Sequence, residues 1–219
     1  MHYKIGNMNI HSEYAAKSAK QQNVEILKWL SNQKKVVKAL DYGCGKLRYS
    51  FELGKTCEEL FLLDSKIQLE RLQVLFNEKT TIYNYIKKYN PFIKVFSAEE
   101  SYKLNIKFDL ILCINVLSSI PTQISRNKVI SNIKSLLKKE GKALFVTQYY
   151  DTFFSKALND SNNIRYNDGW ISKQSYNSFY GLIGPEELEK SLTNKGLIII
   201  NKWKASKSIF IEAGIKGNV

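Results

Sequence analysis

Long apolar runs are absent from this sequence. Among its 219 residues, no uncharged hydrophobic stretch approaches the roughly 18 residues that a membrane span needs. The first residues, MHYKIGNMNIHSEY, lack the apolar core of a secretion signal. We therefore expect a cytoplasmic protein with no membrane association. No internal repeat or low-complexity linker divides the chain, and its length suits one domain with a substantial core.

Cysteine and histidine are scarce. The three cysteines, Cys44, Cys57 and Cys113, are scattered and odd in number, which suits a reducing compartment and gives no metal-ligand spacing. We expect no bound metal, and small core roles for Cys44 and Cys113. The only histidines are His2 and His11 near the N-terminus, so no histidine base is expected after the later strands.

Arginine is rare as well, although the formal net charge is +13. Lysine supplies nearly all of the positive charge, because the only arginines are Arg48, Arg71, Arg126 and Arg165. A basic surface can bind polyanions. The lysines are spread along the chain, however, and the abundance of Lys, Asn, Ile and Tyr matches AT-rich codons. The charge leaves two interpretations open, a solvated lysine-rich surface and a nucleic-acid-binding face.

Strand-like and helix-like patterns alternate along the chain. We expect strands at 36–41, 58–64, 92–97, 108–117 and 142–150, and helices at 12–33, 48–55, 65–89, 125–139 and 185–196. This alternation predicts an α/β, Rossmann-like, doubly wound sheet of mostly parallel strands. The last two strands, LIIINKW and KSIFIEAGI, are joined by a few residues only, so they must form an antiparallel hairpin that completes a seven-stranded sheet.

These elements predict a single domain over residues 1–219. Two embellishments are expected, an N-terminal helix over 12–33 and a lid-like, irregular insertion over about 149–184.

A glycine turn follows the first predicted strand of this sheet, in ALDYGCGKLRYS at residues 39–50. Ligands of such sheets bind at the carboxyl ends of the strands, near the switch in strand order. A dinucleotide-binding loop needs a third glycine where Arg48 stands, which weakens the interpretation as a dehydrogenase. Asp41, just before the first glycine, favours a loop that passes under the amino-acid part of S-adenosylmethionine.

Five segments, in their order along the chain, resemble the class I S-adenosylmethionine-dependent methyltransferases. They are DYGCG, ELFLLD, SAEE, FDLILCINVLSSI and IKSLLKKEGKALFV. The resemblance covers residues 39–147 well and 182–214 in outline. It implies an enzyme that transfers a methyl group, with S-adenosyl-L-methionine as its cofactor.

The resemblance also implies a cofactor site. Asp41 resembles the acid that orients the loop and the methionine end of the cofactor, and Gly43 and Gly45 match loop glycines whose missing Cβ lets the backbone approach the ligand. Asp64 matches the acid that accepts hydrogen bonds from both ribose hydroxyls. The remaining implied positions are Ser97, Ala98 and Glu99 beside the adenine and Asn115 beneath the sulfonium.

Two positions depart from the family pattern. Leu47 stands where the family often has a third glycine, which predicts a loop that is tighter on one side. Ser97 replaces the usual acid facing the adenine amine, which predicts looser recognition of the base.

The sequence does not identify a catalytic base. Methyl transfer is an in-line displacement that mainly needs alignment and desolvation. No D-P-P-Y or N-P-P-Y follows the strand at 108–117, which argues against amino-group DNA methylation, and Cys113 lacks the neighbouring proline of cytosine C5 enzymes. The residues placed to line the acceptor pocket are Tyr149, Tyr150 and Asp151.

Aromatic residues are dense in the segment 149–184. They suit a lid over a flat or hydrophobic acceptor, stacking on nucleic-acid bases, or an insertion with its own small core. Three functions stay open: methylation of a small molecule or metabolite, methylation of RNA, DNA or protein, and a catalytically silent cofactor-binding or partner subunit. The lack of a nucleic-acid signature favours the first, and the intact acid–glycine set argues against the last.

Overall fold

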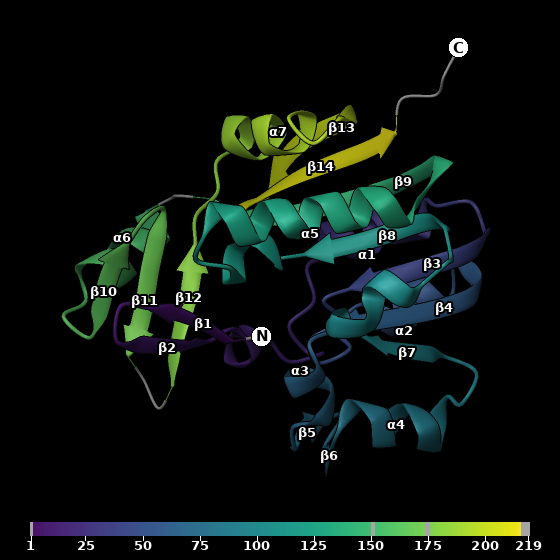
Figure 1. The fold of residues 1–219 in the computed structure, drawn as a ribbon, viewed down its shortest axis with the longest axis horizontal. Helices are drawn as coiled ribbons and strands as arrows, with labels where there is room; N and C mark the ends of the chain where they lie inside the picture. The colour runs from purple at the N-terminus through teal and green to yellow at the C-terminus, as the bar shows by residue number, and fades with distance from the viewer. Residues whose placement is uncertain (1, 150–151, 174–175, 216–219) are drawn as a thin grey trace.

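A seven-stranded sheet forms the centre of the molecule in a computed structural model, which describes residues 2–149, 152–173 and 176–215 (Figure 1). Its order is β13-β14-β9-β8-β3-β4-β7. The five strands β7, β4, β3, β8 and β9 run parallel, whereas β14 is antiparallel to both β9 and β13. This confirms the predicted Rossmann-like sheet and its antiparallel hairpin. The strand bounds are β3 (Val36–Tyr42), β4 (Cys57–Asp64), β7 (Lys94–Ser97), β8 (Phe108–Ile114), β9 (Leu137–Gln148), β13 (Leu197–Ala205) and β14 (Ser208–Ile215).

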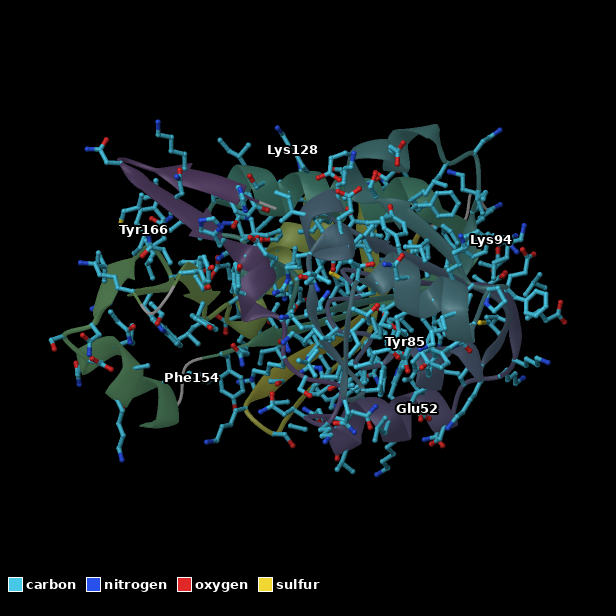
Figure 2. The ribbon with its side chains drawn as sticks, turned by 90° about the horizontal axis from the view of Figure 1, so that it is seen from below. Glu52, Tyr85, Lys94, Lys128, Phe154 and Tyr166 are labelled. Carbon is cyan, nitrogen blue, oxygen red and sulfur yellow. The ribbon has the colours of Figure 1, made fainter. Side chains whose placement is uncertain are left out.

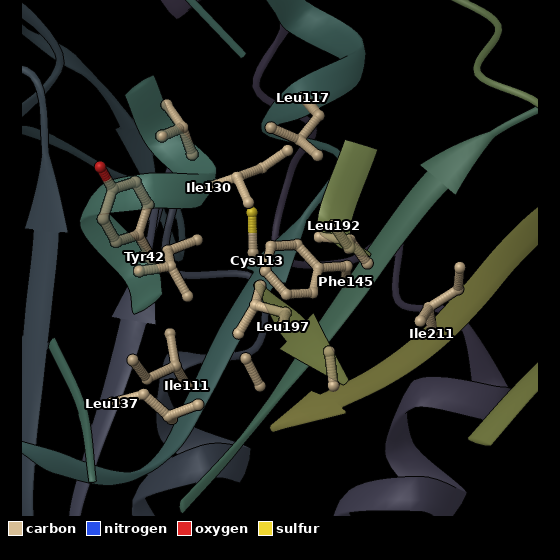
Figure 3. Packing of buried hydrophobic residues seen from close by; sticks show 14 of the residues in the cluster. Tyr42, Ile111, Cys113, Leu117, Ile130, Leu137, Phe145, Leu192, Leu197 and Ile211 are labelled. Carbon is tan, nitrogen blue, oxygen red and sulfur yellow. The ribbon is translucent and has the colours of Figure 1, made fainter. Parts of the chain in front are cut away.

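Helices cover both faces of this sheet, and each face has its own hydrophobic core. The central strands carry nearly continuous apolar stretches, such as residues 60–63 of β4 and 110–114 of β8, as expected for strands that are buried on two sides. One face packs against α5 (Gln123–Leu136) and α7 (Pro185–Thr193), and Figure 3 shows Cys113 pointing into this core near Ile130 and Phe145. The other face packs against α1 (Val24–Ser31), α2 (Ser50–Gly54) and α4 (Ile82–Tyr89). The predicted core roles of Cys44 and Cys113 are confirmed, since both are at most 4% exposed.

The predicted helix over 12–33 is wrong in its first half. The chain begins with a hairpin of β1 (His2–Ile5) and β2 (Met8–His11), followed by a short 3-10 helix, η1 (Ser12–Ala15). The α-helix α1 starts only after Asn23, whose side chain accepts the backbone N–H of Glu25 at 2.9 Å. The true N-cap therefore lies eleven residues after Ser12, the cap that the sequence suggested.

The predicted long helix over 65–89 is also interrupted. It consists of α3 (Lys66–Glu70), a hairpin of β5 (Gln73–Leu75) and β6 (Glu78–Thr80), and α4. The hairpin turn places Phe76 and Asn77 at positive φ, which no α-helix allows. Thr81 then caps α4 by accepting the backbone N–H of Asn84 at 3.1 Å.

The helix expected at 125–139 ends at Leu136, and Gly141 lies inside β9 and does not stop a helix. A Cβ on Gly141 would lie 2.6 Å from the carbonyl oxygen of Phe108, so the close approach of two strands explains this glycine.

The insertion over 149–184 is regular, not irregular as the sequence suggested. It holds α6 (Thr152–Asn159) and an antiparallel sheet of β10 (Asn163–Tyr166), β11 (Gly169–Lys173) and β12 (Asn177–Gly181). Phe154, Trp170 and Leu182 form a small core of its own. The β1–β2 hairpin lies across the same sheet, where Ile10 packs on Ile171 and Phe179 (Figure 1).

We call α6, β10–β12 and the β1–β2 hairpin the side lobe. Figure 2 shows its labelled residues Phe154 and Tyr166 at one end of the molecule, with Glu52, Tyr85 and Lys94 toward the opposite end. Across the described ranges, no helix has the length and apolar character required to cross a membrane.

Candidate cofactor and acceptor site

A cavity lies at the carboxyl ends of β3, β4 and β8, between the central sheet and the side lobe. Strands β3 and β8 are neighbours in the sheet, and the chain leaves them toward opposite edges, so the cavity sits at the switch in strand order. The central sheet and its loops line it with Asp41, Gly43, Gly45, Asp64, Ala98 and Asn115. The side lobe contributes Tyr3, Phe179 and Tyr180, and the chain just after the β1–β2 hairpin contributes Glu13 and Lys17.

Asp64 ends β4 and holds the glycine loop. Its Oδ2 accepts the backbone N–H of Gly45 at 2.8 Å, and its Oδ1 accepts the backbone N–H of Ser65 at 2.7 Å. Burial raises the pKa of Asp64, while these backbone hydrogen bonds act in the opposite direction. The hydroxyl of Ser65 also donates to Oδ1 in a long contact of 3.5 Å. A carboxylate offers about four lone-pair sites, so one remains for a ligand in the cavity, and a second becomes available if the long Ser65 contact gives way.

Asp41 is the penultimate residue of β3 and is only 4% exposed. Its Oδ2 accepts the hydroxyl of Ser50 at 2.7 Å. Burial raises the pKa of Asp41 to about 6, with the hydrogen bond from Ser50 acting against the shift. The cavity therefore carries a carboxyl group whose charge is costly in the empty protein and would be compensated by a cationic ligand group.

The glycine loop has three residues in the left-handed region. Gly43 has a φ of +78° and Gly45 a φ of +57°. A Cβ on Gly43 would lie 2.3 Å from Cγ2 of Val116, so the first glycine also makes room for the segment after β8. Leu47 has a φ of +60° and is 1% exposed. The position where the family often has a third glycine thus keeps the glycine-like backbone conformation, at a cost of about 1–2 kcal/mol for a leucine.

Asn115 follows β8 and also has a positive φ, of +59°. Its backbone N–H donates to the carbonyl of Val146 at 2.8 Å, which fixes the backbone. Its side-chain Oδ1 is buried without a hydrogen-bond partner, although the residue lines the cavity. Because a buried acceptor without a partner costs about 1–3 kcal/mol, this oxygen is suited to a donor on a bound ligand.

Several predicted site residues lie beside the cavity and do not line it. Ser97 is buried and donates its hydroxyl to Glu100 at 2.7 Å, and Glu99 accepts the backbone N–H of Lys66 at 3.0 Å. Tyr149 packs against the core on the sheet face that α5 and α7 cover, with Lys204 over its ring. The other two acceptor candidates, Tyr150 and Asp151, lie outside the described residues.

The N-terminal wall of the cavity was not predicted from the sequence. Tyr3 on β1 and Glu13 on η1 line the cavity, as does Lys17 beyond them. A signal for the hairpin exists in the sequence, because HYKI and MNIH flank Gly6-Asn7, a turn-forming pair. The predicted helix began only at residue 12, so residues 2–11 were assigned to no element and to no part of the site.

Comparisons with known proteins agree with this geometry. A family model described as "Methyltransferase domain" matches residues 13–200. The chain is 35% identical over 215 residues to the uncharacterized protein YmfD of Escherichia coli K12, covering 98% of this chain and 96% of that one. With its class I, Rossmann-like sheet, the chain belongs to the methyltransferase domain family.

Solved structures share the fold at low sequence identity. An S-adenosylmethionine-dependent methyltransferase from Clostridium acetobutylicum is 18% identical, with a TM-score of 0.65 and coverage of 93% of this chain and 94% of that one. The 1,6-didemethyltoxoflavin-N1-methyltransferase of Burkholderia thailandensis, solved with its substrate and S-adenosylhomocysteine, is 12% identical, with a TM-score of 0.59 and coverage of 91% and 79%.

Proposed function

We propose that this chain transfers a methyl group from S-adenosylmethionine to a small-molecule acceptor. The enzyme is a methyltransferase and its cofactor is S-adenosylmethionine, as family membership and the class I fold indicate. The identity of the acceptor is the part that we infer. The structural neighbour from Burkholderia, which was solved with bound 1,6-didemethyltoxoflavin, supports the choice of a small molecule.

The chain's own residues would hold the cofactor from three strand ends. Asp64 would accept one ribose hydroxyl at its remaining lone-pair site and a second in place of the long contact from Ser65, and its bond to Gly45 keeps the loop in place before binding. Asp41 supplies buried negative charge beneath the loop. When bound, S-adenosylmethionine supplies an electrophilic methyl group on its sulfonium. The protein's contribution to the transfer is alignment of the acceptor and exclusion of water.

The observation that carries the small-molecule proposal is the aromatic wall of the cavity. Tyr3 of the hairpin and Phe179 and Tyr180 of β12 line the same cavity as the cofactor residues. Two separate elements therefore close over the strand ends, which suits a small flat or apolar acceptor and leaves little access for a folded macromolecule. The unpartnered Oδ1 of Asn115 would accept an N–H or O–H of the ligand, giving a polar contact in this pocket.

The proposal can be tested with the purified chain and methyl-labelled S-adenosylmethionine. Isothermal titration first measures binding of S-adenosylmethionine and S-adenosylhomocysteine, for which we expect dissociation constants in the micromolar range, about −8 kcal/mol at 1 μM. A cell extract is then separated into small molecules, RNA, DNA and protein, and each fraction is offered as acceptor. We expect label in the small-molecule fraction.

Two controls make the result interpretable. Asp64→Ala should abolish labelling at low cofactor concentration, whereas Glu140→Ala, at an exposed position, should not change it. Label only in the RNA, DNA or protein fraction would replace the small-molecule proposal with the macromolecular alternative. Tight cofactor binding with no label in any fraction would support a catalytically silent subunit instead.

A further inference from the structure

Three groups with metal-binding chemistry converge at the open end of the β1–β2 hairpin. His2 and His11 face each other as direct partners across the two strands, and Glu13 follows in η1. Nε2 of His2 lies 2.8 Å and Nδ1 of His11 lies 3.1 Å from the same Oε1 of Glu13. The two ring nitrogens are 3.0 Å apart. These are the only two histidines of the whole sequence.

Hydrogen bonds alone cannot explain all three short contacts in this triangle of two ring nitrogens and one carboxylate oxygen. Each of the two ring nitrogens carries at most one proton, and a carboxylate oxygen carries none. At most two of the three short contacts can therefore be hydrogen bonds, and the third brings two groups together without a proton between them.

We propose that His2, His11 and Glu13 bind one divalent transition-metal ion. Imidazole and carboxylate are the donors that zinc, iron, cobalt and nickel ions share. A cation about 2.1 Å from each of three atoms in such a triangle lies roughly 1.2 Å to one side of their plane, which is the facial arrangement of a three-ligand site with open positions.

The surroundings support a fixed site with access from solvent. The side chain of Glu13 is 2% exposed, while those of His11 and His2 are 25% and 45% exposed, so a buried carboxylate is reached past two imidazoles. The ring of His11 is packed edge-on against Tyr176, which stacks on Tyr14 at 3.9 Å between ring centroids. The orientation of one imidazole is therefore held by aromatic packing, as support around metal ligands commonly requires.

The position of the cluster gives the cation a role. Glu13 lines the proposed active-site cavity, and Tyr3, next to His2, lines it too. A cation bound by both strands of the hairpin and by η1 would fasten the N-terminal wall of the cavity. The cofactor residues Asp41 and Asp64 are not among its ligands, so cation binding and cofactor binding are separate properties.

The test uses the full chain, purified without a polyhistidine tag and freed of metal by a chelator. Titration with Zn²⁺ and with Co²⁺ should give one equivalent per chain with a micromolar or tighter dissociation constant. Co²⁺ should produce visible d–d absorption without a thiolate charge-transfer band, since all three cysteines are buried elsewhere. In NMR spectra both histidine ring signals should shift on adding Zn²⁺, an assignment made simple by the presence of two histidines only.

Matched variants locate the site. His11→Asn and Glu13→Gln should each weaken Zn²⁺ binding at least tenfold, and Lys4→Gln, on the same hairpin, should leave it unchanged. If circular dichroism shows that Glu13→Gln does not fold, His2→Gln replaces it, because His2 is the most exposed of the three. No Zn²⁺ binding by the wild-type chain, or binding that Glu13→Gln and His2→Gln leave intact, would overturn the proposal, whatever the outcome of the cofactor titration.

Discussion

The carboxylate of Asp64 accepts the backbone N–H of Gly45 at 2.8 Å, so a single side chain joins the end of β4 to the glycine loop after β3. The loop is fixed from the backbone side too, because Gly43 donates its N–H to the carbonyl of Leu63 at 2.7 Å. Gln68 donates to the carbonyl of Gly45 at 2.5 Å. The proposed ribose acid and the loop thus form one preorganised unit before any ligand arrives.

This relationship predicts the effect of replacing Asp64. Asp64→Ala should weaken S-adenosylmethionine binding by about 1.5–3 kcal/mol, since hydrogen bonds to charged groups contribute about that much. That loss corresponds to a dissociation constant raised roughly 10- to 150-fold in isothermal titration. Asp64→Asn, which keeps one acceptor oxygen, should lose less than Asp64→Ala. Unchanged affinity in both variants would show that the carboxylate does not contact the cofactor.

The raised pKa of Asp41 predicts a pH-dependent stability. The pKa of Asp41 is about 6 in the folded state, whereas in the unfolded chain the carboxyl has its ordinary pKa of 3.8. The folded state therefore binds more protons between these values, and the contribution of Asp41 to stability falls as the pH rises through this window. Two pKa units correspond to about 3 kcal/mol.

Asp41→Asn removes this titration and keeps an oxygen that can accept the hydroxyl of Ser50. The variant should gain stability relative to the wild type as the pH rises from about 4 to 7, by up to about 3 kcal/mol. Urea unfolding of both proteins across this range measures the difference. A difference that does not change with pH would show that Asp41 has an ordinary pKa in the folded chain.

At position 47 we predict that the glycine variant is more stable than the alanine variant, the reverse of the usual order. Both Leu47→Ala and Leu47→Gly lose a buried side chain, which costs about 2–5 kcal/mol. Because φ is +60° at this position, glycine should be the more stable of the two by about 1 kcal/mol. At Leu53, buried in α2, the order should be the ordinary one, with alanine more stable by about 0.5–1 kcal/mol. The same order at both sites would contradict a strained Leu47.

How far the sequence predicted the fold depended on the kind of element. The central strands were predictable because a strand buried on both faces carries a nearly continuous apolar run, as residues 110–114 do in β8. The predicted helix over 12–33 contains α1 only in its second half, and the β5–β6 hairpin interrupts the predicted helix over 65–89, because its apolar residues have spacings that also fit a helix. The β1–β2 hairpin was not predicted at all. It packs against a distant segment, as in Ile10 against Phe179, and such packing leaves no local trace in the sequence.

The candidate site was likewise predictable where it is formed by the central strands, but not where it is formed by the side lobe. Asp41, Asp64 and Asn115 follow apolar strands, so their place at one edge of the sheet follows from topology alone. The residues Tyr3, Glu13 and Tyr180 reach the cavity only because the side lobe folds back over the strand ends. The sequence correctly indicated that the segment 149–184 approaches the site, but not which of its aromatic residues face the cavity. Trp170, for example, packs behind Tyr180, with ring centroids 5.4 Å apart.

Tyr180 is therefore the residue that should affect the acceptor. Tyr180→Ala should leave cofactor affinity within about threefold, roughly 0.6 kcal/mol, because its side chain lies on the side-lobe wall and not at the strand ends. Turnover of the acceptor should fall much more. Lys173→Ala, on the neighbouring strand and exposed, is the control and should change neither property. Loss of cofactor binding with unchanged acceptor turnover would show that this wall serves the cofactor.

The side lobe is joined to the central domain by a buried ion pair. Arg126 of α5, whose side chain is 4% exposed, pairs through both terminal nitrogens with the carboxylate of Asp168, between β10 and β11. Its Nε also donates to the carbonyl of Ile120 at 2.8 Å, and Ile120 lines the cavity. Gly181 makes room for this guanidinium, since a Cβ there would lie 2.7 Å from its nitrogen. One arginine thus holds the side lobe against the cavity.

Removing one member of this pair should be costly. Asp168→Ala should destabilise the protein by up to about 3–5 kcal/mol, because it leaves the buried guanidinium with only the more distant carboxylate of Glu187, at 3.9 Å, as a counter-charge. Arg126→Met should also destabilise, but the double variant should lose clearly less than the sum of the two, with a coupling of at least about 2 kcal/mol in urea unfolding. The exposed pair Lys202–Glu189, at 2.7 Å, provides a matched cycle in which we expect a coupling below about 1 kcal/mol.

If the side lobe positions the acceptor, Asp168→Ala should also reduce methyl transfer at a temperature where the protein is still folded, with cofactor affinity retained. Additive losses in the Arg126–Asp168 cycle would show that the two residues act through other neighbours and that the ion pair does not anchor the lobe.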